Sequence, residues 1–315
     1  MSTIVSAPGK IHLLGEHVVV YGKPALLTAI NRRLYVEIKE SNSSGLIIKT
    51  TEDEHLVRKT IAVFQKAFKL SVLPPLEIII SSAILTGCGL GSSSALASAL
   101  IGALIKHLKN IWNPNRINEF TYEVEKIAHG NPSGADNTAV VFGGLVWFRR
   151  EFEFLKSIWS LPVSSYKIPS FVLIDSGRPV ETTREMVESV ANFARAKKVL
   201  FSKILDDQED QTKKLLLSLK EGNLDQMKNA FLAGQRNLEK IGVVGKKAKM
   251  IIAKVEKIGG VAKVCGAGGY KKGSGIILAY HQNLSKMEKL AKTLGLDLTQ
   301  IIPGGEGIRI EKNQN

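Results

Sequence analysis

Short runs of aliphatic and β-branched residues recur through the first half of the chain and predict strands. They cover residues 34–38, 46–49, 76–80 and 140–148. Two stretches with helical character, residues 95–105 and 116–128, lie between the last two runs. The second stretch has one apolar face, made of Ile117, Phe120, Val124 and Ile127. Strands interspersed with two helices predict an α+β domain over residues 1–155.

Helical patterns dominate the second half of the chain. A strand-like run at residues 171–174 precedes a largely helical region at 183–219, and two more helices follow within 224–258. Near the end, two strand-like runs flank a helix at 284–294. We therefore expect a second domain over residues 156–315, and the fold class is predicted as α+β with two domains.

A loop rich in glycine and serine joins the 76–80 run to the helix at 95–105. Glycines let the backbone approach an anion closely, and the first N–H groups of a helix are free to bind phosphate. The candidate phosphate-binding residues are Gly87, Gly89, Leu90, Gly91, Ser92, Ser93 and Ser94. A tight turn before a capped core helix is the alternative. The spacing matches neither a P-loop nor a dinucleotide-binding fingerprint, which disfavours P-loop hydrolases and Rossmann dehydrogenases.

Charged residues lie beside glycine in two further segments. Near the N-terminus, Lys10, Glu16 and His17 lie in a segment whose glycines and prolines predict turns. Glu125 falls in the last turn of the 116–128 helix, where its charge opposes the helix dipole unless a cation balances it. Asp136 follows in a turn rich in proline, serine and glycine. For each of these residues taken alone, an ordinary solvated side chain is the competing interpretation.

A second glycine-rich loop, basic in character, runs from Lys263 to Gly275 and leads into a strand-like run. On its own it is also typical of a hairpin turn with a solvated lysine pair. The two cysteines of the chain, Cys88 and Cys265, lie one in each glycine-rich loop. Nearby backbone N–H groups would lower the pKa of such thiols, and one hypothesis is that reagents that modify thiols inhibit the protein. The alternative, which is favoured, is that both cysteines are inert small hydrophobic residues in turns.

The composition fits a globular protein of 315 residues with a net charge of +14. Aromatic residues make up only 6% of the chain, and no stacking platform or DNA-binding motif accompanies the lysines, so a nucleic-acid partner is not expected. No apolar run approaches the roughly 20 residues of a membrane helix. Two cysteines give no disulfide framework, which indicates a reducing compartment and predicts a cytoplasmic location.

In this order, the segments resemble the GHMP small-molecule kinases, and within that family the mevalonate kinase branch. The N-terminal motif A-P-G-K, then G-E-H, then V-V-x-G-K is reproduced from Ala7 to Lys23. The motif E-x-x-x-H-G-x-P-S-G-x-D is reproduced from Glu125 to Asp136. The resemblance extends from residue 5 to about residue 310. It implies a ribosomal S5-like N-terminal domain, a ferredoxin-like C-terminal domain and an active site in the cleft between them.

The resemblance also implies an activity: the transfer of phosphate from ATP, with Mg²⁺, to the 5-hydroxyl of mevalonate. Asp136 matches the catalytic carboxylate of the family and Lys10 its cationic partner. Ser93 and Glu125 match the magnesium ligands. Residues Glu16, His17 and Thr183 align with substrate-side positions, and Gly266 and Gly268 belong to the second nucleotide loop. A homodimer is compatible with the family, and the sequence does not decide the oligomeric state.

Two departures from the family pattern affect the phosphate loops. In the second loop, Cys265 replaces a threonine and the segment from Tyr270 to Lys272 interrupts the glycines. In the first loop, the family usually has a leading proline, and this chain has Thr86-Gly87-Cys88 instead. Both departures bear on the affinity for nucleotide and the choice of nucleotide. The alternative functions are a kinase for a related alcohol, such as phosphomevalonate or a sugar, and a silent paralogue that only binds nucleotide or metabolite. A phosphomevalonate site needs a cluster of arginine or lysine, whereas the substrate-side segment offers only Arg184, which favours mevalonate.

Overall fold

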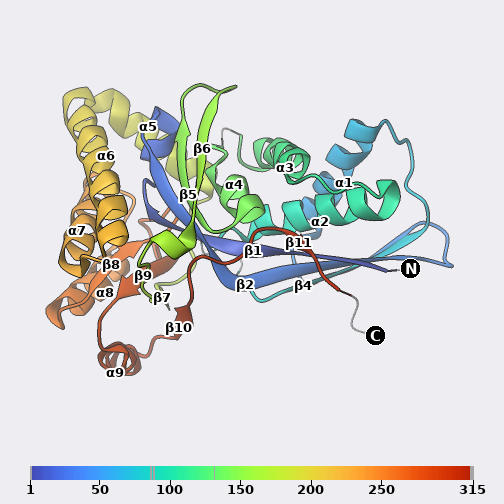
Figure 1. Cartoon of the computed structure of the whole chain (residues 1–315). Helices are drawn as coiled ribbons and strands as arrows, with labels where there is room; N and C mark the ends of the chain where they lie inside the picture. Colours follow the sequence, from blue (N-terminus) through green and yellow to red (C-terminus); the bar gives the residue numbers. More distant parts are fainter. Residues whose placement is uncertain (1, 86, 88, 131, 313–315) are drawn as a thin grey trace.

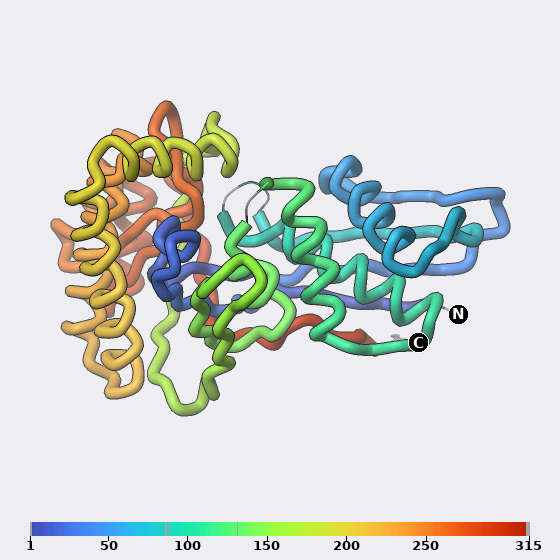
Figure 2. Tube along the Cα trace, turned by 90° about the horizontal axis from the view of Figure 1, so that it is seen from above, coloured from blue at the N-terminus to red at the C-terminus, as the bar shows by residue number. Residues whose placement is uncertain are grey.

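The computed structural model describes residues 2–85, 87, 89–130 and 132–312. These residues form two sheets, one of seven strands and one of four, with helices packed against both (Figure 1). The N- and C-terminal ends lie close together at the far end of the larger sheet (Figures 1 and 2). No helix in the described part of the chain is long and apolar enough to cross a membrane.

The larger sheet is built mainly from the first half of the chain. Its main path runs β11-β1-β2-β4-β3, and the hairpin of β5 and β6 continues from β2. All pairs are antiparallel except β3 with β4. The strands are β1 (Thr3–Leu14), β2 (Ala25–Glu40), β3 (Leu46–Lys49), β4 (Leu76–Ser82), β5 (Leu145–Arg150), β6 (Lys156–Leu161) and β11 (Arg309–Ile310).

Helices α1, α2 and α3 lie over one face of this sheet, and α4 lies beside β5 (Figure 1). These helices are α1 (Glu54–Phe68), α2 (Ser92–Lys109), α3 (Pro114–His129) and α4 (Ala135–Phe142). In α2, every residue from 94 to 105 is buried, because the helix lies between the sheet and α1 and α3. Its small and aliphatic residues exclude water from the core and fix the start of α2 beneath the glycine-rich loop.

The smaller sheet belongs to the second half of the chain. Its strands are β7 (Phe171–Asp175), β8 (Val261–Val264), β9 (Ile276–Tyr280) and β10 (Leu298–Ile301). Four helices separate β7 from β8, namely α5 (Thr183–Ala196), α6 (Lys198–Glu221), α7 (Leu224–Lys240) and α8 (Lys246–Lys257), and α9 (Leu284–Leu294) separates β9 from β10. The spatial order β10-β7-β9-β8 is antiparallel throughout, which is the ferredoxin-like arrangement that the family resemblance implied.

The structure corrects several sequence predictions. The N-terminal segment expected to form turns is the long strand β1 as far as Leu14, and the turns come after it. The strand predicted over 140–148 begins only at Leu145, because residues 135–142 form α4. The first half thus holds α1 and α4 beyond the two helices predicted. Ile127 is 52% exposed and does not belong to the buried face of α3.

The two sheets do not divide at residue 155. Strand β6 starts at Lys156 but pairs with β5 of the larger sheet. At the other end of the chain, β11 returns to pair with β1, and Pro303 bridges to Ile30 of β2. A domain boundary therefore remains a prediction. The strand pairing favours a boundary after β6, with the last residues of the chain returning to the first domain.

Candidate active site

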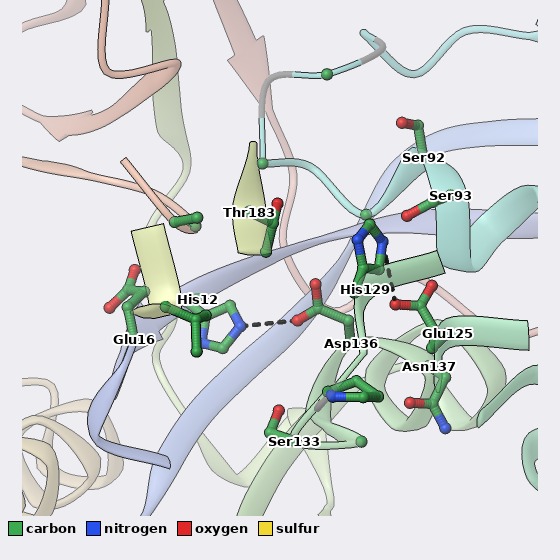
Figure 3. Close-up of a pocket in the computed structure, with 18 of the residues that line it drawn as sticks. His12, Glu16, Ser92, Ser93, Glu125, His129, Ser133, Asp136, Asn137 and Thr183 are labelled. Atoms are coloured by element: carbon green, nitrogen blue, oxygen red, sulfur yellow. Dashed lines mark hydrogen bonds and ion pairs between the residues drawn. The ribbon is translucent and has the colours of Figure 1, made fainter. Parts of the chain in front are cut away.

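A cavity of about 410 Å³ lies where β1, the glycine-rich loops and the facing ends of α3 and α4 come together (Figure 3). Its walls include ten residues labelled in the figure: His12, Glu16, Ser92, Ser93, Glu125, His129, Ser133, Asp136, Asn137 and Thr183. Segments that are more than a hundred residues apart in the sequence thus meet at one place. A concave site with several converging titratable groups is the usual setting for catalysis.

Lys10, on β1, is only 1% exposed and is joined to the cavity through Asp136, which lines it. Its Nζ lies 2.9 Å from Oδ2 of Asp136 and donates a second hydrogen bond to the carbonyl of Gly89, at 3.0 Å. Burial alone would lower the pKa of this amine, but the Asp136 carboxylate outweighs that effect and raises it. Lys10 therefore stays charged and ties the first glycine-rich loop to the carboxylate.

Asp136 occupies the first turn of α4, and the sequence had predicted a turn there. The positive end of the helix dipole stabilises a carboxylate at this position. Its Oδ1 accepts a hydrogen bond from Nε2 of His12 at 2.9 Å. Burial would raise the pKa of Asp136, but Lys10 and His12 together lower it well below its usual range. The ionised side chain is 38% exposed and faces the cavity.

Glu125 lies near the end of α3 and is buried. Its Oε1 accepts a hydrogen bond from the Ser94 hydroxyl at 2.9 Å, and its Oε2 lies 3.6 Å from Nε2 of His129. Burial raises the pKa of Glu125, so its ionised form is costly in the ligand-free protein. A cation beside this carboxylate would remove that cost.

The serines that follow the first glycine-rich loop differ in position. Ser92 and Ser93 line the cavity at the start of α2 (Figure 3). Ser94 is fully buried and holds Glu125 instead of facing the cavity. The side chain of Leu90 is also buried, and its carbonyl accepts a hydrogen bond from the Lys10 N–H. A direct phosphate contact through the side chain of Leu90 or Ser94 is therefore not available in this arrangement.

The two glycine-rich loops touch each other. A Cβ atom on Gly89 would come within 2.5 Å of the Cys265 carbonyl, and Gly89 has a φ of +85°. Gly91 also has a positive φ, and a Cβ there would meet the side chain of Lys10. Gly266 lines the main cavity, as does Gly87. Gly268 instead lines an adjoining cavity of about 270 Å³.

Burial raises the pKa of the Cys265 thiol, which is 1% exposed. The expected lowering of its pKa is therefore wrong, because desolvation outweighs the effect of nearby positive groups, and the structure favours the alternative of an inert cysteine. Cys88 lies outside the described residues. The inserted segment of the second loop is fastened by Glu181, whose Oε1 accepts hydrogen bonds from the N–H groups of Tyr270 and Lys271.

The three predicted substrate-side residues all line the cavity. His17 has a φ of 61° and donates from Nε2 to the Ala267 carbonyl at 2.9 Å. Burial lowers the pKa of His17, so the neutral ring is favoured. Glu16 forms a buried ion pair with Lys263, and Thr183 is the first residue of α5.

Several residues of this site were not predicted from the sequence. They are His12, His129, Arg178 and Lys263. His12 could have been found, because it stands two residues after Lys10 and so points to the same side of a strand. Arg178, and not Arg184, is the arginine that lines the cavity. The guanidinium of Arg184 lies instead against Gly130.

The described residues contain no group of three or more histidine, cysteine, aspartate and glutamate side chains arranged to hold a metal ion. Ser93 and Glu125 nevertheless offer hydroxyl and carboxylate oxygens on one wall of the cavity. Mg²⁺ is commonly bound by one or two protein oxygens together with substrate phosphates and water. The donor set and the raised pKa of Glu125 therefore fit this ion.

Comparison with known proteins gives two matches to family models. Residues 55–144 match the N-terminal domain of GHMP kinases, and residues 2–40 match a galactokinase galactose-binding signature. Among curated proteins, the mevalonate kinase of Archaeoglobus fulgidus is 32% identical over 98% of this chain and 100% of its own length. The mevalonate kinase of Pyrococcus abyssi is 31% identical over 84% of this chain and 86% of its own.

Solved structures show the same architecture. The mevalonate kinase of Methanococcus jannaschii has a TM-score of 0.80 and 21% identity, covering 96% of this chain and 98% of its own. The L. major mevalonate kinase in complex with R-mevalonate also has a TM-score of 0.80, with 20% identity over 95% of this chain and 96% of its own. The predicted α+β fold of the GHMP kinases is thus confirmed along nearly the whole chain.

Proposed function

The chain belongs to the mevalonate kinases of the GHMP kinase family, and from this premise we propose that its cavity transfers the γ-phosphoryl group of ATP to the 5-hydroxyl of mevalonate. The observation that carries the proposal is the buried pair of Lys10 and Asp136, which faces a cavity bordered by two glycine-rich loops. A paralogue without catalytic activity would not require a charged lysine and an ionised carboxylate in this geometry.

Asp136 would receive the substrate hydroxyl. Its pKa is lowered, so it is a weak base, and its first role is to accept a hydrogen bond and align the oxygen for attack. In a loose phosphoryl-transfer transition state the hydroxyl proton leaves late, and a weak base is then sufficient. Lys10 would stabilise the negative charge that develops between the acceptor oxygen and the transferred group.

The first glycine-rich loop would hold the phosphates of ATP. Gly87, Gly89 and Gly91 all have positive φ values and leave the backbone bare, so phosphate oxygens can approach the free N–H groups at the start of α2. Ser92 and Ser93 add hydroxyls on the same wall. Gly266, from the second loop, lies against Gly89 and lines the same cavity, so it would also border the phosphates.

We propose Ser93 and Glu125 as the protein ligands of Mg²⁺. When bound, the ion would neutralise phosphate charge and orient the transferred group. Glu125 is held for this purpose by Ser94, whose hydroxyl occupies one carboxylate oxygen and leaves the other toward His129. The protein itself contributes an oriented carboxylate whose burial makes a cation favourable.

On the substrate side, mevalonate offers a carboxylate and a tertiary hydroxyl in addition to the reacting primary hydroxyl. Arg178 is the cavity residue that suits the carboxylate. His17 and Thr183 can bind the tertiary hydroxyl, and Glu16, fixed by Lys263, can orient them. A cytoplasmic location and a homodimer, both compatible with the sequence, remain proposals.

A sugar is the second candidate substrate, because residues 2–40 match a galactose-binding signature. The test is coupled ADP release by the purified protein with ATP and Mg²⁺, against mevalonate, phosphomevalonate, galactose and homoserine. We expect mevalonate to give the highest kcat/KM and a phosphorylated product at its primary hydroxyl. A preference for galactose would overturn the substrate, and no turnover with any alcohol would overturn the kinase proposal.

A further inference from the structure

Asp136 has a second donor besides Lys10. Nζ of Lys10 lies 2.9 Å from Oδ2, and Nε2 of His12 lies 2.9 Å from Oδ1, so each carboxylate oxygen has its own partner. The two donors are two residues apart on β1 and therefore project from the same side of the strand. Figure 3 shows the imidazole of His12 directed at the Asp136 carboxylate along one wall of the cavity.

His12 is itself held firmly. Its side chain is buried, and its carbonyl accepts a hydrogen bond from Nζ of Lys263 at 3.2 Å. Because Asp136 is ionised and only accepts hydrogen bonds, Nε2 of His12 must carry the proton in this pair. The other ring nitrogen, Nδ1, is buried and has no hydrogen-bond partner among the described residues. The bond to Asp136 is thus the one polar contact of this ring within the described part of the chain.

A single donor would not fix the direction of the Asp136 carboxylate. With Lys10 alone, the group could rotate about its Cβ–Cγ bond while keeping one ion pair. Lys10 and His12 bind different oxygens and so define the plane of the Asp136 carboxylate. The lone pairs that remain free on these oxygens then point in fixed directions. Since the side chain is partly exposed to the cavity, that direction decides where a substrate hydroxyl must lie.

We propose that His12 is a positioning residue for phosphoryl transfer: it holds the Asp136 carboxylate so that a free lone pair faces the acceptor hydroxyl. This inference rests on the proposed role of Asp136. A displacement of about 1 Å at a reacting centre can cost a factor of about 100 in rate, so losing this donor lowers kcat. Binding of ATP, on the opposite wall near Ser92, is unaffected.

The experiment compares His12→Gln with His12→Asn. The amide nitrogen of glutamine occupies a place similar to Nε2 of histidine, whereas that of asparagine corresponds to Nδ1 and cannot reach Asp136. Both variants are polar and smaller than histidine, so a general packing defect affects them alike. His107→Gln is the matched control, because His107 also bonds a side-chain oxygen of β1, that of Thr3, away from the cavity.

We expect kcat for mevalonate to fall about 10- to 100-fold in His12→Asn, with the KM for ATP changed less than about twofold. His12→Gln should recover most of the loss, and His107→Gln should match the wild type. Equal losses in folded Gln and Asn variants, or a rise in KM for mevalonate with unchanged kcat, would overturn the positioning role. Wild-type turnover and its loss in Asp136→Asn are measured first, so failure of the proposed function is detected separately.

Discussion

Lys10 on β1 and Asp136 at the start of α4 form an ion pair of 2.9 Å between residues 126 positions apart, and the lysine is almost completely buried. An isolated ammonium in such a place would be strongly destabilising. Its charge is kept because the carboxylate, the Gly89 carbonyl and the first glycine-rich loop surround it. Lys10 therefore joins the first glycine-rich loop to Asp136, the carboxylate proposed to bind the substrate hydroxyl.

Replacing Asp136 with asparagine keeps the shape of the side chain and removes its charge. We expect kcat to fall at least about 100-fold, because both the acceptor for the hydroxyl proton and the partner of Lys10 are lost. Binding of ATP, measured by calorimetry, should persist. Turnover close to that of the wild type would exclude Asp136 from the mechanism.

Glu125→Gln should weaken Mg²⁺ binding and stabilise the metal-free protein. Without its charge the residue is a poorer Mg²⁺ ligand, and we expect the Mg²⁺ concentration for half-maximal activity to rise on the order of tenfold. Activity measured across a magnesium titration tests this. The neighbouring variant Glu123→Gln, on the same helix but exposed, is the control. If the Mg²⁺ concentration for half-maximal activity does not change, Glu125 is not a magnesium ligand and its role is structural.

The stability effect of Glu125 depends on pH. Because its pKa is raised in the folded protein, the folded state holds this proton at a higher pH than the unfolded chain does. Stability of the metal-free protein is thus lost as pH rises from about 4.5 through the raised pKa. We expect the metal-free Glu125→Gln variant to melt about 2 °C or more above the wild type at pH 7, with a smaller difference at pH 5. A lower Tm of the variant at pH 7 would show that the buried Glu125 carboxylate does not destabilise the metal-free protein.

The sequence predicted the strand-loop-helix unit around the first glycine-rich loop well. Apolar residues fill β4 and α2 continuously, and glycines separate them, so the local pattern determines the local structure. The prediction failed at α4, where a strand was expected over residues 140–148. A short apolar helix of eight residues cannot be told from a buried strand by its composition. Length was the missing signal, since the helix ends at Gly143 before β5 begins.

Residues around the cavity were predicted where a motif marks them and missed where only the fold brings them together. Glu125 and Asp136 stand in one motif, but Lys263 is brought to Glu16 only by the packing of β8 against the end of β1. No spacing in the sequence indicates that contact. His12 belongs to neither group. No motif marks it, but predicting β1 as a strand would have placed it on the same side as Lys10.

The buried pair of Glu16 and Lys263 should be sensitive to single substitutions. Lys263→Met leaves a 2% exposed carboxylate without its cation, and we expect a loss of about 3–5 kcal/mol in unfolding free energy. Adding Glu16→Gln should restore most of it, because no unpaired charge remains. Chemical denaturation of both variants and of Lys271→Met, an exposed lysine, measures the difference. Additive effects would show that the two side chains do not interact.

The last prediction concerns the choice between mevalonate and phosphomevalonate. A second phosphate on the substrate needs several cationic side chains, and Arg178 is the single arginine or lysine among the described residues that line the cavity. Five carboxylates line the same cavity: Glu16, Glu52, Asp53, Glu125 and Asp136. Lysines neutralise two of them, Asp136 and Glu16, so the cavity lining offers little positive charge for a substrate that carries both a carboxylate and a phosphate.

We therefore expect kcat/KM for phosphomevalonate to be at least about tenfold lower than for mevalonate, a discrimination of about 1.4 kcal/mol. Steady-state kinetics with each substrate at fixed ATP and Mg²⁺ measure this ratio. Arg178→Met should raise the KM for mevalonate, while Arg184→Met, whose guanidinium lies against Gly130 outside the cavity lining, serves as the matched control. Equal or better use of phosphomevalonate would show that one arginine is enough to hold the second phosphate, and the charge argument for mevalonate would fail.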